Sequence, residues 1–223
     1  DVVIDDELTE FDVAPPATAW WIPAGEWNRY EYLYNRTPLV EVGQVHTPMT
    51  IRTADGLHIA FHEAALVDYS SMWLRRVEGQ RFRAQLAPAA GGWKVRRTAP
   101  FHTPWRTLRV ADSAAALYES NLELNLNEPN ALGDVSWFVP AKYVGVWWEL
   151  HLELTTWATG PRHGATTANT RRYIDFAAKH GFRGVLVEGW NIGWDGQWFG
   201  NGNDFNFTQS APGFDLEGLA AYA

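Results

Sequence analysis

The stretch from Lys142 to Trp194 constrains the fold of this chain more than any other. It is predicted to run strand, loop, helix, strand. The unbroken apolar run Tyr143–Trp148 is typical of a strand buried on both faces, and Val185–Val187 predicts a second such strand. Between them, a helix is expected to begin after Thr166 or Thr167. Because a βαβ unit makes its two strands parallel, their carboxyl ends should lie at one edge.

Tryptophan and carboxylate side chains follow both predicted strands. Ligands of open α/β sheets and of (β/α)8 barrels bind at the carboxyl edge of the strands. Aromatic rings pack on the C–H faces of sugars, and acids and amides bond to sugar hydroxyls, so the predicted ligand is a sugar. The candidate contacts are Glu149, His151, Glu188, Trp190 and Asn191.

The sequence supports Glu188 as a ligand contact more strongly than Glu149. Glu188 ends a buried strand, where a charge is costly unless it is paired or used. Because residues alternate along a strand, Glu188 and Trp190 should point the same way. Glu149, His151 and Glu153 alternate with apolar residues and would share one side of an extended segment. For this second group, hydroxyl recognition and a plain polar strand edge both stay open.

The first part of the chain, to about Leu126, predicts antiparallel β structure. Short alternating segments flank turn residues such as Asp55-Gly56, which is a hairpin signal. Strands at this spacing indicate a β-sandwich. The predicted strands are Thr50–Thr53, Leu57–His62, Met72–Arg75, Arg81–Leu86, Trp93–Arg96 and Trp105–Ala111. One helix, Ala114–Ser120, is expected to follow a cap at Asp112 or Ser113.

The polar, turn-rich stretch Asn125–Asp134 predicts a boundary between two domains, residues 1–133 and 134–223. Near the end, Asp215 is expected to cap a helix over Leu216–Ala223, which is too short to be stable alone. Two βα units cannot close a barrel or cover their own sheet. We therefore expect the chain to be an internal fragment of a longer protein.

Composition excludes several classes of partner. The net charge is −8, and the lysines and arginines are dispersed, so nucleic acid is not an expected partner. The longest apolar runs are too short to span a bilayer, and no N-terminal basic-then-apolar signal segment is present. The chain has no cysteine, which excludes disulfides and thiolate sites.

Glu63 is the one candidate metal ligand. It follows an alternating strand and neighbours His62, and a carboxylate in that position suits a hard cation. On spacing alone, a plain surface acid is the better interpretation. His46, His58 and His62 are not spaced like zinc ligands, so zinc is not expected.

With these residues in view, the chain resembles glycoside hydrolase family 97, a family of bacterial exo-acting α-glucosidases and α-galactosidases. The similar segments cover most of the chain in the family's order. They are HEAALVDYSSM (62–72), TPWRTLRVAD (103–112), SNLELNLNEPN (120–130), KYVGVWWELH (142–151), TTW, HGATTANTRRYIDFAAKHGF (163–182) and VLVEGWNIGW (185–194).

The resemblance implies the end of an N-terminal antiparallel β-super-sandwich, followed by the first βα units of an incomplete (β/α)8 TIM barrel. It implies a calcium ion in the active site, with Glu63 supplying one carboxylate ligand. The catalytic acid and bases are expected beyond residue 223. Glu149 and Glu188 are therefore implied to shape the substrate pocket, together with the other edge residues His151, Trp190 and Asn191.

The implied activity is release of a terminal sugar from α-linked oligosaccharides. The sequence VEGWN (187–191) is more similar to the inverting α-glucosidase branch than to the retaining α-galactosidase branch. The resemblance also implies a bacterial periplasmic or extracellular location. The alternatives are a retaining α-galactosidase of the same family, another α-glycosidase barrel, and a non-catalytic carbohydrate-binding or structural module.

Overall fold

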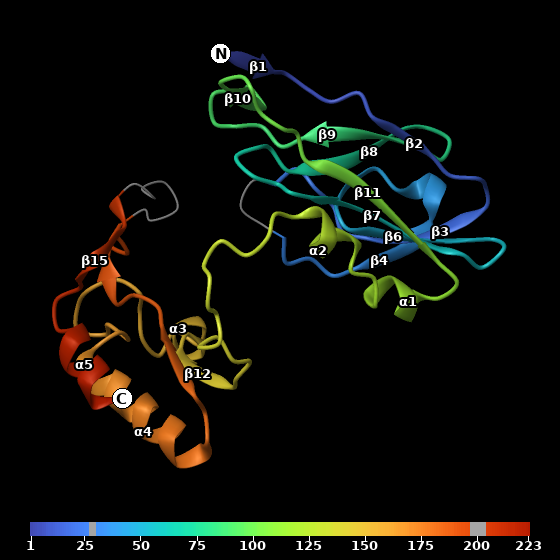
Figure 1. Cartoon of the computed structure of the whole chain (residues 1–223). Helices are drawn as coiled ribbons and strands as arrows, with labels where there is room; N and C mark the ends of the chain where they lie inside the picture. The colour runs from blue at the N-terminus through green and yellow to red at the C-terminus, as the bar shows by residue number, and fades with distance from the viewer. Residues whose placement is uncertain (27–29, 197–203) are drawn as a thin grey trace. The chain divides into compact units, whose positions relative to one another are not determined.

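The computed structural model describes residues 1–26, 30–196 and 204–223. They form two units, Asp1–Ala131 and Leu132–Ala223, which are described separately below (Figure 1). The division follows Ala131, whereas the sequence places the boundary after residue 133.

The N-terminal unit contains two antiparallel sheets, with strand orders β11-β7-β6-β3-β4 and β2-β9-β8-β5, and a short pair, β1 with β10. The strands of the first sheet are β3 (Ala17–Trp21), β4 (Asn35–Pro38), β6 (Met49–Thr53), β7 (His58–Ala64) and β11 (Trp105–Ala111). Those of the second are β2 (Glu10–Asp12), β5 (Gln44–His46), β8 (Met72–Glu78) and β9 (Arg81–Leu86). The short pair is β1 (Val2–Ile4) and β10 (Val95–Arg97).

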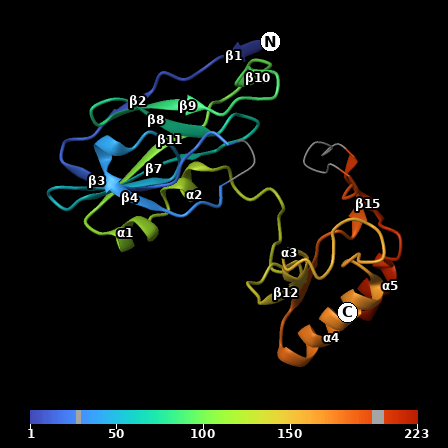
Figure 2. The same ribbon diagram turned by 180° about the vertical axis from the view of Figure 1, so that it is seen from behind.

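The two sheets bury their facing sides in one core. On β9, Phe82, Ala84 and Leu86 are buried and the residues between them are not, because alternate side chains of a strand point to opposite faces. Phe61 of the first sheet packs in the same apolar cluster as Phe82 of the second. The predicted antiparallel sandwich is confirmed, and Figure 2 shows its strands from behind.

Three short helices complete this unit: η1 (Leu39–Glu41), α1 (Ala114–Tyr118) and α2 (Leu122–Leu126). The Ser113 hydroxyl accepts a hydrogen bond from the Ala116 N–H, which confirms the predicted start of α1. Helix α2 was not predicted. Its Glu123 accepts hydrogen bonds from Thr107 and Arg109 of β11, and these bonds fix the helix to the outer face of the first sheet.

The C-terminal unit begins with the predicted βαβ arrangement. Strands β12 (Tyr143–Val146) and β13 (Gly184–Val187) pair in parallel, and α4 (Thr167–His180) lies between them in the sequence. The Thr166 hydroxyl accepts a hydrogen bond from the Asn169 N–H and caps the helix. A closed (β/α)8 barrel stays a prediction, because the described residues hold a single β12–α4–β13 crossover.

One expectation for this unit is wrong. The apolar run ends as a strand at Val146, and Trp148–His151 forms a single helical turn, α3, which buries Leu150. Glu149, His151 and Glu153 therefore do not share one side of an extended segment. Tyr143 is 64% exposed and Leu186 is 47% exposed in this chain, so burial of both strand faces stays a prediction for the longer protein. In the described residues, α4 covers only the face to which Val185 and Val187 point.

The rest of the unit is a hairpin and a final helix. Strands β14 (Asn191–Ile192) and β15 (Asn206–Ser210) pair antiparallel, which the sequence did not predict. The Asp215 carboxylate accepts a hydrogen bond from the Gly218 N–H at 2.9 Å and caps α5 (Leu216–Tyr222), as predicted. None of the helices in the described ranges is long and apolar enough to cross a membrane.

Candidate functional site

Glu188 directly follows β13 and is half-buried. Its Oε2 accepts a hydrogen bond from Nε1–H of Trp157 at 2.7 Å. Within the ranges that the structure describes, no hydrogen-bond donor reaches Oε1. One oxygen of this carboxylate is therefore held by an indole, and the other is available to a ligand.

The chain turns sharply after Glu188. Gly189 has φ +83°, and a Cβ there would lie 3.0 Å from the carbonyl oxygen of Trp157. Nε2 of the buried His163 lies 2.9 Å from the Gly189 carbonyl oxygen. Because a carbonyl can only accept, this nitrogen carries the proton. The position thus requires glycine both for its backbone conformation and for its closeness to the neighbouring loop.

Strand alternation does not continue past this turn. The ring of Trp190 packs with Val187 against the buried cluster of Ala165, Phe214 and Leu219. The shared direction of Glu188 and Trp190, which was predicted from alternation, is therefore not observed, and the role of Trp190 as a sugar contact stays a prediction. Asn191 is 2% exposed.

The polar groups of Asn191 are used within the hairpin. Its amide nitrogen donates to the carbonyls of Ile192 and Asn206, both at 3.2 Å. Its Oδ1 accepts from Nε1–H of Trp194 at 2.9 Å. The side chain therefore ties β14 to β15, and the predicted sugar contact at this residue stays untested.

Aromatic rings form a row that begins at Trp157, the hydrogen-bond donor to Glu188. The ring centroids of His151 and Trp157 are 5.3 Å apart, and those of Trp147 and His151 are 4.2 Å apart. Trp147 and Trp148 are 41% and 62% exposed. The structure thus brings one acid, Glu188, beside an aromatic surface at the carboxyl ends of β12 and β13, which is the edge that the sequence predicts for a sugar.

Glu149 lies elsewhere. Its Oε1 accepts a hydrogen bond from Nδ2–H of Asn169 in α4 at 2.5 Å. It lines a cavity of about 260 Å³ with Val144 and with Arg172, Tyr173 and Phe176 of the same helix. Burial raises the pKa of Tyr173, and the charge and hydrogen bond of Glu149 raise it further. Glu149 therefore faces α4, and His151 is the residue that neighbours Trp157.

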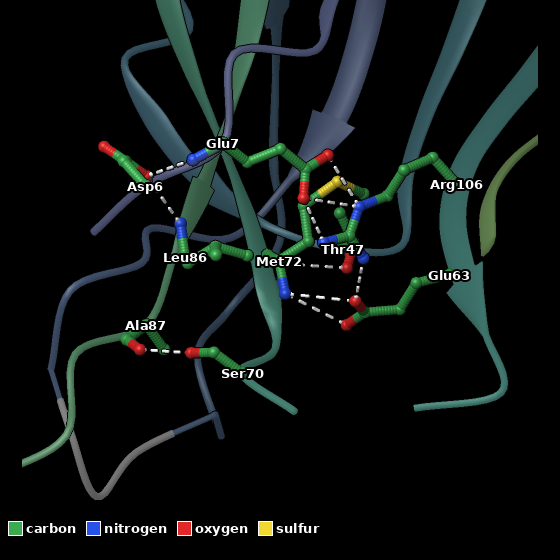
Figure 3. A network of polar contacts seen from close by, with 9 residues as sticks. All are labelled: Asp6, Glu7, Thr47, Glu63, Ser70, Met72, Leu86, Ala87 and Arg106. Atoms are coloured by element: carbon green, nitrogen blue, oxygen red, sulfur yellow. Dashed lines mark hydrogen bonds and ion pairs between the residues drawn. The ribbon is translucent and has the colours of Figure 1, made fainter. Parts of the chain in front are cut away.

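In the N-terminal unit, Glu63 belongs to a buried ion-pair network (Figure 3). It lies opposite Arg106 in the register of β7 and β11, and its Oε2 accepts from Nη1–H of Arg106 at 2.6 Å. Both of its oxygens lie 3.1 Å from the backbone nitrogen of Met72 in β8. Arg106 also donates through Nε to Glu7, at 2.9 Å to Oε1 and 3.1 Å to Oε2.

The electrostatics follow from this burial. The side chain of Glu63 is 7% exposed, so a surface acid, the interpretation favoured by spacing alone, is wrong. Burial raises the pKa of Glu63, although the Met72 N–H and Arg106 oppose the rise. Burial also opposes ionisation of Glu7, but the hydrogen bonds and charge of Arg106 outweigh it and lower the pKa of Glu7.

Glu63 also lines a cavity of about 520 Å³ in this unit, and Tyr30, His46 and Trp73 are among the other lining residues. A carboxylate on a cavity wall is chemically suited to calcium, which takes about 6–8 oxygen ligands. Across residues 1–26, 30–196 and 204–223, no group of three or more His, Asp or Glu side chains is placed to hold a metal. Glu63 therefore fits a calcium site as one ligand, and the described residues do not form such a site by themselves.

Trp157 and His163 were not among the predicted site residues. Each lies on a loop and bonds to the segment after β13. Trp157 and Glu188 are 31 residues apart in the sequence, and His163 and Gly189 are 26 residues apart. Periodicity carries no information about such contacts. The only available signal was that both residues fall in segments of the family resemblance, TTW and the segment that begins at His163.

Comparison with known proteins identifies both units. The profile of the Glycosyl-hydrolase 97 N-terminal domain matches residues 1–129, and that of Glycoside hydrolase 97 matches residues 147–223. A solved glycoside hydrolase family 97 enzyme in complex with acarbose, from Pseudoalteromonas sp. strain K8, is 55% identical with a TM-score of 0.88. A variant of that enzyme has been solved in complex with panose.

The matches differ in coverage. The alignment with the Pseudoalteromonas enzyme covers 99% of this chain and 34% of that one. A retaining alpha-galactosidase of Bacteroides thetaiotaomicron is 26% identical over 189 residues, which is 74% of this chain and 28% of that protein. A beta-arabinopyranosidase, 19% identical with a TM-score of 0.57, shares the fold. This chain thus spans about a third of the length of its relatives.

Proposed function

Because this chain belongs to glycoside hydrolase family 97, we propose that the whole protein is an exo-acting α-glycoside hydrolase that releases a terminal sugar from α-linked oligosaccharides. The observation that carries the proposal is the 55% identity, over 99% of the chain, to an enzyme solved with acarbose. Panose, found with a variant of that enzyme, is an oligosaccharide of α-linked glucose. These ligands favour a glucoside as the substrate.

The second candidate is retaining α-galactosidase activity. It is favoured by the names of the curated relatives, a retaining alpha-galactosidase and a probable retaining alpha-galactosidase, which are 26% and 28% identical. We rank it second because both identities are about half that of the Pseudoalteromonas enzyme.

We propose a calcium-dependent reaction with inversion at the anomeric carbon. In an inverting enzyme, one carboxylic acid protonates the leaving oxygen and a carboxylate activates water on the opposite face of the sugar. Calcium, when bound, would stabilise negative charge and hold oxygen atoms in place. Glu63 would be one of its ligands. Arg106 and the Met72 N–H hold that carboxylate at the cavity, and the acid and base would come from residues outside this chain.

The test uses the full-length protein with 4-nitrophenyl α-glucoside and α-galactoside, each with calcium and after removal of calcium by a chelator. We expect calcium-dependent release of nitrophenol from the glucoside, and β-glucose as the first product by NMR. Faster hydrolysis of the galactoside, with α-galactose released first, would establish the second candidate. Binding of panose without any hydrolysis would favour a carbohydrate-binding module instead. We also propose that the protein acts in the periplasm or medium, which cell fractionation would test.

A further inference from the structure

A short loop of the C-terminal unit, Thr156–His163, contacts the segment that follows β13 at three places. We call it the clamp loop. The indole of Trp157 bonds to Glu188, and the imidazole of His163 bonds to the Gly189 carbonyl. Thr159 donates to Asp195, from its backbone N–H at 2.8 Å and from its hydroxyl at 2.9 Å. The loop thus holds the backbone and two carboxylates, Glu188 and Asp195, of the segment that follows the strand.

The clamp loop is itself closed by backbone hydrogen bonds. The Thr156 N–H donates to the Arg162 carbonyl at 2.8 Å, and the Gly164 N–H donates to the Thr156 carbonyl at 3.0 Å. The His163 N–H donates to the Gly160 carbonyl at 3.1 Å. Because the two ends of the loop are bonded to each other, the position of Trp157 is set by the backbone as well as by the packing of its ring.

The bond from Trp157 to Glu188 has a definite chemical consequence. An indole has one N–H and no acceptor, so it can only donate to the carboxyl group of Glu188, and this bond fixes which oxygen faces the loop. A hydrogen bond to a charged acceptor is stronger than one between neutral groups. With Oε2 held at 2.7 Å, rotation of the carboxylate is restricted and Oε1 keeps its acceptor capacity.

We propose that Trp157 is a positioning residue, which holds Glu188 so that Oε1 accepts a hydroxyl of the terminal sugar. This inference rests on the proposed glycosidase function and adds a residue to its binding site. The ring of His151 packs on Trp157 and the ring of Trp147 packs on His151, so an aromatic surface continues from the residue that holds the carboxylate, and a pyranose needs both kinds of contact. A single free acceptor atom selects one hydroxyl group, so the bond should control which hydroxyl is recognised.

The experiment measures hydrolysis by the full-length protein of a 4-nitrophenyl α-glycoside and of its monodeoxy analogues. The first variant is Trp157→Phe, which keeps a ring but removes the N–H. Trp21→Phe is the matched control. The Trp21 indole donates to the Thr37 hydroxyl at 3.1 Å inside the sandwich, so the same substitution removes a hydrogen bond away from Glu188. Glu188→Gln, which removes the charge, is the second variant.

For the parent substrate, we expect Trp157→Phe to lower kcat/KM about tenfold, as for loss of a hydrogen bond to a charged group. With one of the deoxy analogues, Trp157→Phe and wild-type should have the same kcat/KM. That analogue already lacks the hydroxyl from which Oε1 would accept a hydrogen bond. Glu188→Gln should lose its preference for the same hydroxyl. Trp21→Phe should lower the melting temperature, but the analogues should keep the same order of kcat/KM as with the wild-type protein.

Two negative outcomes are distinct. If the wild-type protein hydrolyses α-glycosides but Trp157→Phe lowers kcat/KM by the same factor for every analogue, Trp157 is a structural residue and the inference is overturned. The inference is also overturned if Trp157→Phe and Glu188→Gln weaken the recognition of different sugar hydroxyls. If the wild-type protein hydrolyses neither α-glucosides nor α-galactosides, the proposed function fails and the inference fails with it.

Discussion

Replacing Arg106 with methionine should destabilise the N-terminal sandwich strongly, because it leaves the buried Glu63 and the partly buried Glu7 without their shared cation. The side chains of Arg106, Glu7 and Glu63 are 10%, 18% and 7% exposed. Removing one partner of a buried ion pair costs about 3–5 kcal/mol. We expect a loss near the lower end, about 3 kcal/mol, because Glu63 keeps the Met72 N–H and Glu7 is close enough to water to be rehydrated.

The assay is calorimetric unfolding of the 223-residue chain at neutral pH. A loss of about 3 kcal/mol should lower the melting temperature of the sandwich by roughly 10 °C. The matched control is Arg83→Met. Arg83 also bonds to a glutamate, Glu10, at 2.6 Å, but the two side chains are 44% and 30% exposed. A surface pair of this kind contributes about 0–1 kcal/mol, so the control should unfold within a few degrees of wild-type.

The pH dependence has a predicted sign. Arg106 lowers the pKa of Glu7 in wild-type, so this acid contributes stability above its unfolded pKa of about 4.3, and the contribution is lost as pH falls. Without Arg106, burial raises the pKa of both acids, and each then costs stability as pH rises above about 4.3. The gap between wild-type and Arg106→Met should therefore be larger at pH 7.5 than at pH 5. Equal losses in Arg106→Met and Arg83→Met, or a gap independent of pH, would refute the reasoning.

Three further predictions concern activity, calcium and the turn after β13. The purified chain 1–223 should release no nitrophenol from 4-nitrophenyl α-glucoside, because the acid and base are expected outside it; calcium-dependent release would contradict this. In the full-length protein, Glu63→Gln should weaken calcium binding about tenfold or more in a calorimetric titration, because one charged ligand is lost, and an unchanged titration would remove Glu63 from the site. Gly189→Ala should lower stability by about 2 kcal/mol or more, because the residue has φ +83° and its Cβ would press on the Trp157 carbonyl. Gly79→Ala is the control, because Gly79 has φ +52° and open space around its Cβ, so the substitution strains only the backbone. An equal loss of stability in both variants would show that the contact between a Cβ at position 189 and the Trp157 carbonyl costs nothing.

The parts of the fold that the sequence predicts are those determined by local chemistry. The β6–β7 hairpin follows from alternation on either side of Gly56, which has φ +94° in the turn. The start of helix α4 follows from a threonine cap, and that of α5 follows from Asp215. In each case, the deciding residues lie within a few positions of one another.

The end of β12 could not be predicted in this way. The apolar run continues through Trp148, so composition gives no reason to end the strand at Val146. What the structure adds is the close approach of the neighbouring strand: a Cβ on Gly145 would lie 2.8 Å from the Leu186 carbonyl oxygen. After that contact, the chain turns into α3 and buries Leu150. Glu149 consequently faces α4, where no strand-based argument would place it.

The tryptophans show why the candidate site could be located but not resolved from the sequence. The chain has thirteen, and their number indicates neither core nor binding surface. The structure separates several of them by what they contact: Trp21 donates to a threonine, Trp157 donates to the acid at the end of a strand, and Trp190 packs against an apolar cluster. The sequence favours Trp190 because it stands two residues from Glu188. The loop that brings Trp157 to the same carboxylate is set by tertiary contacts, so the pairing is visible only once the chain is folded.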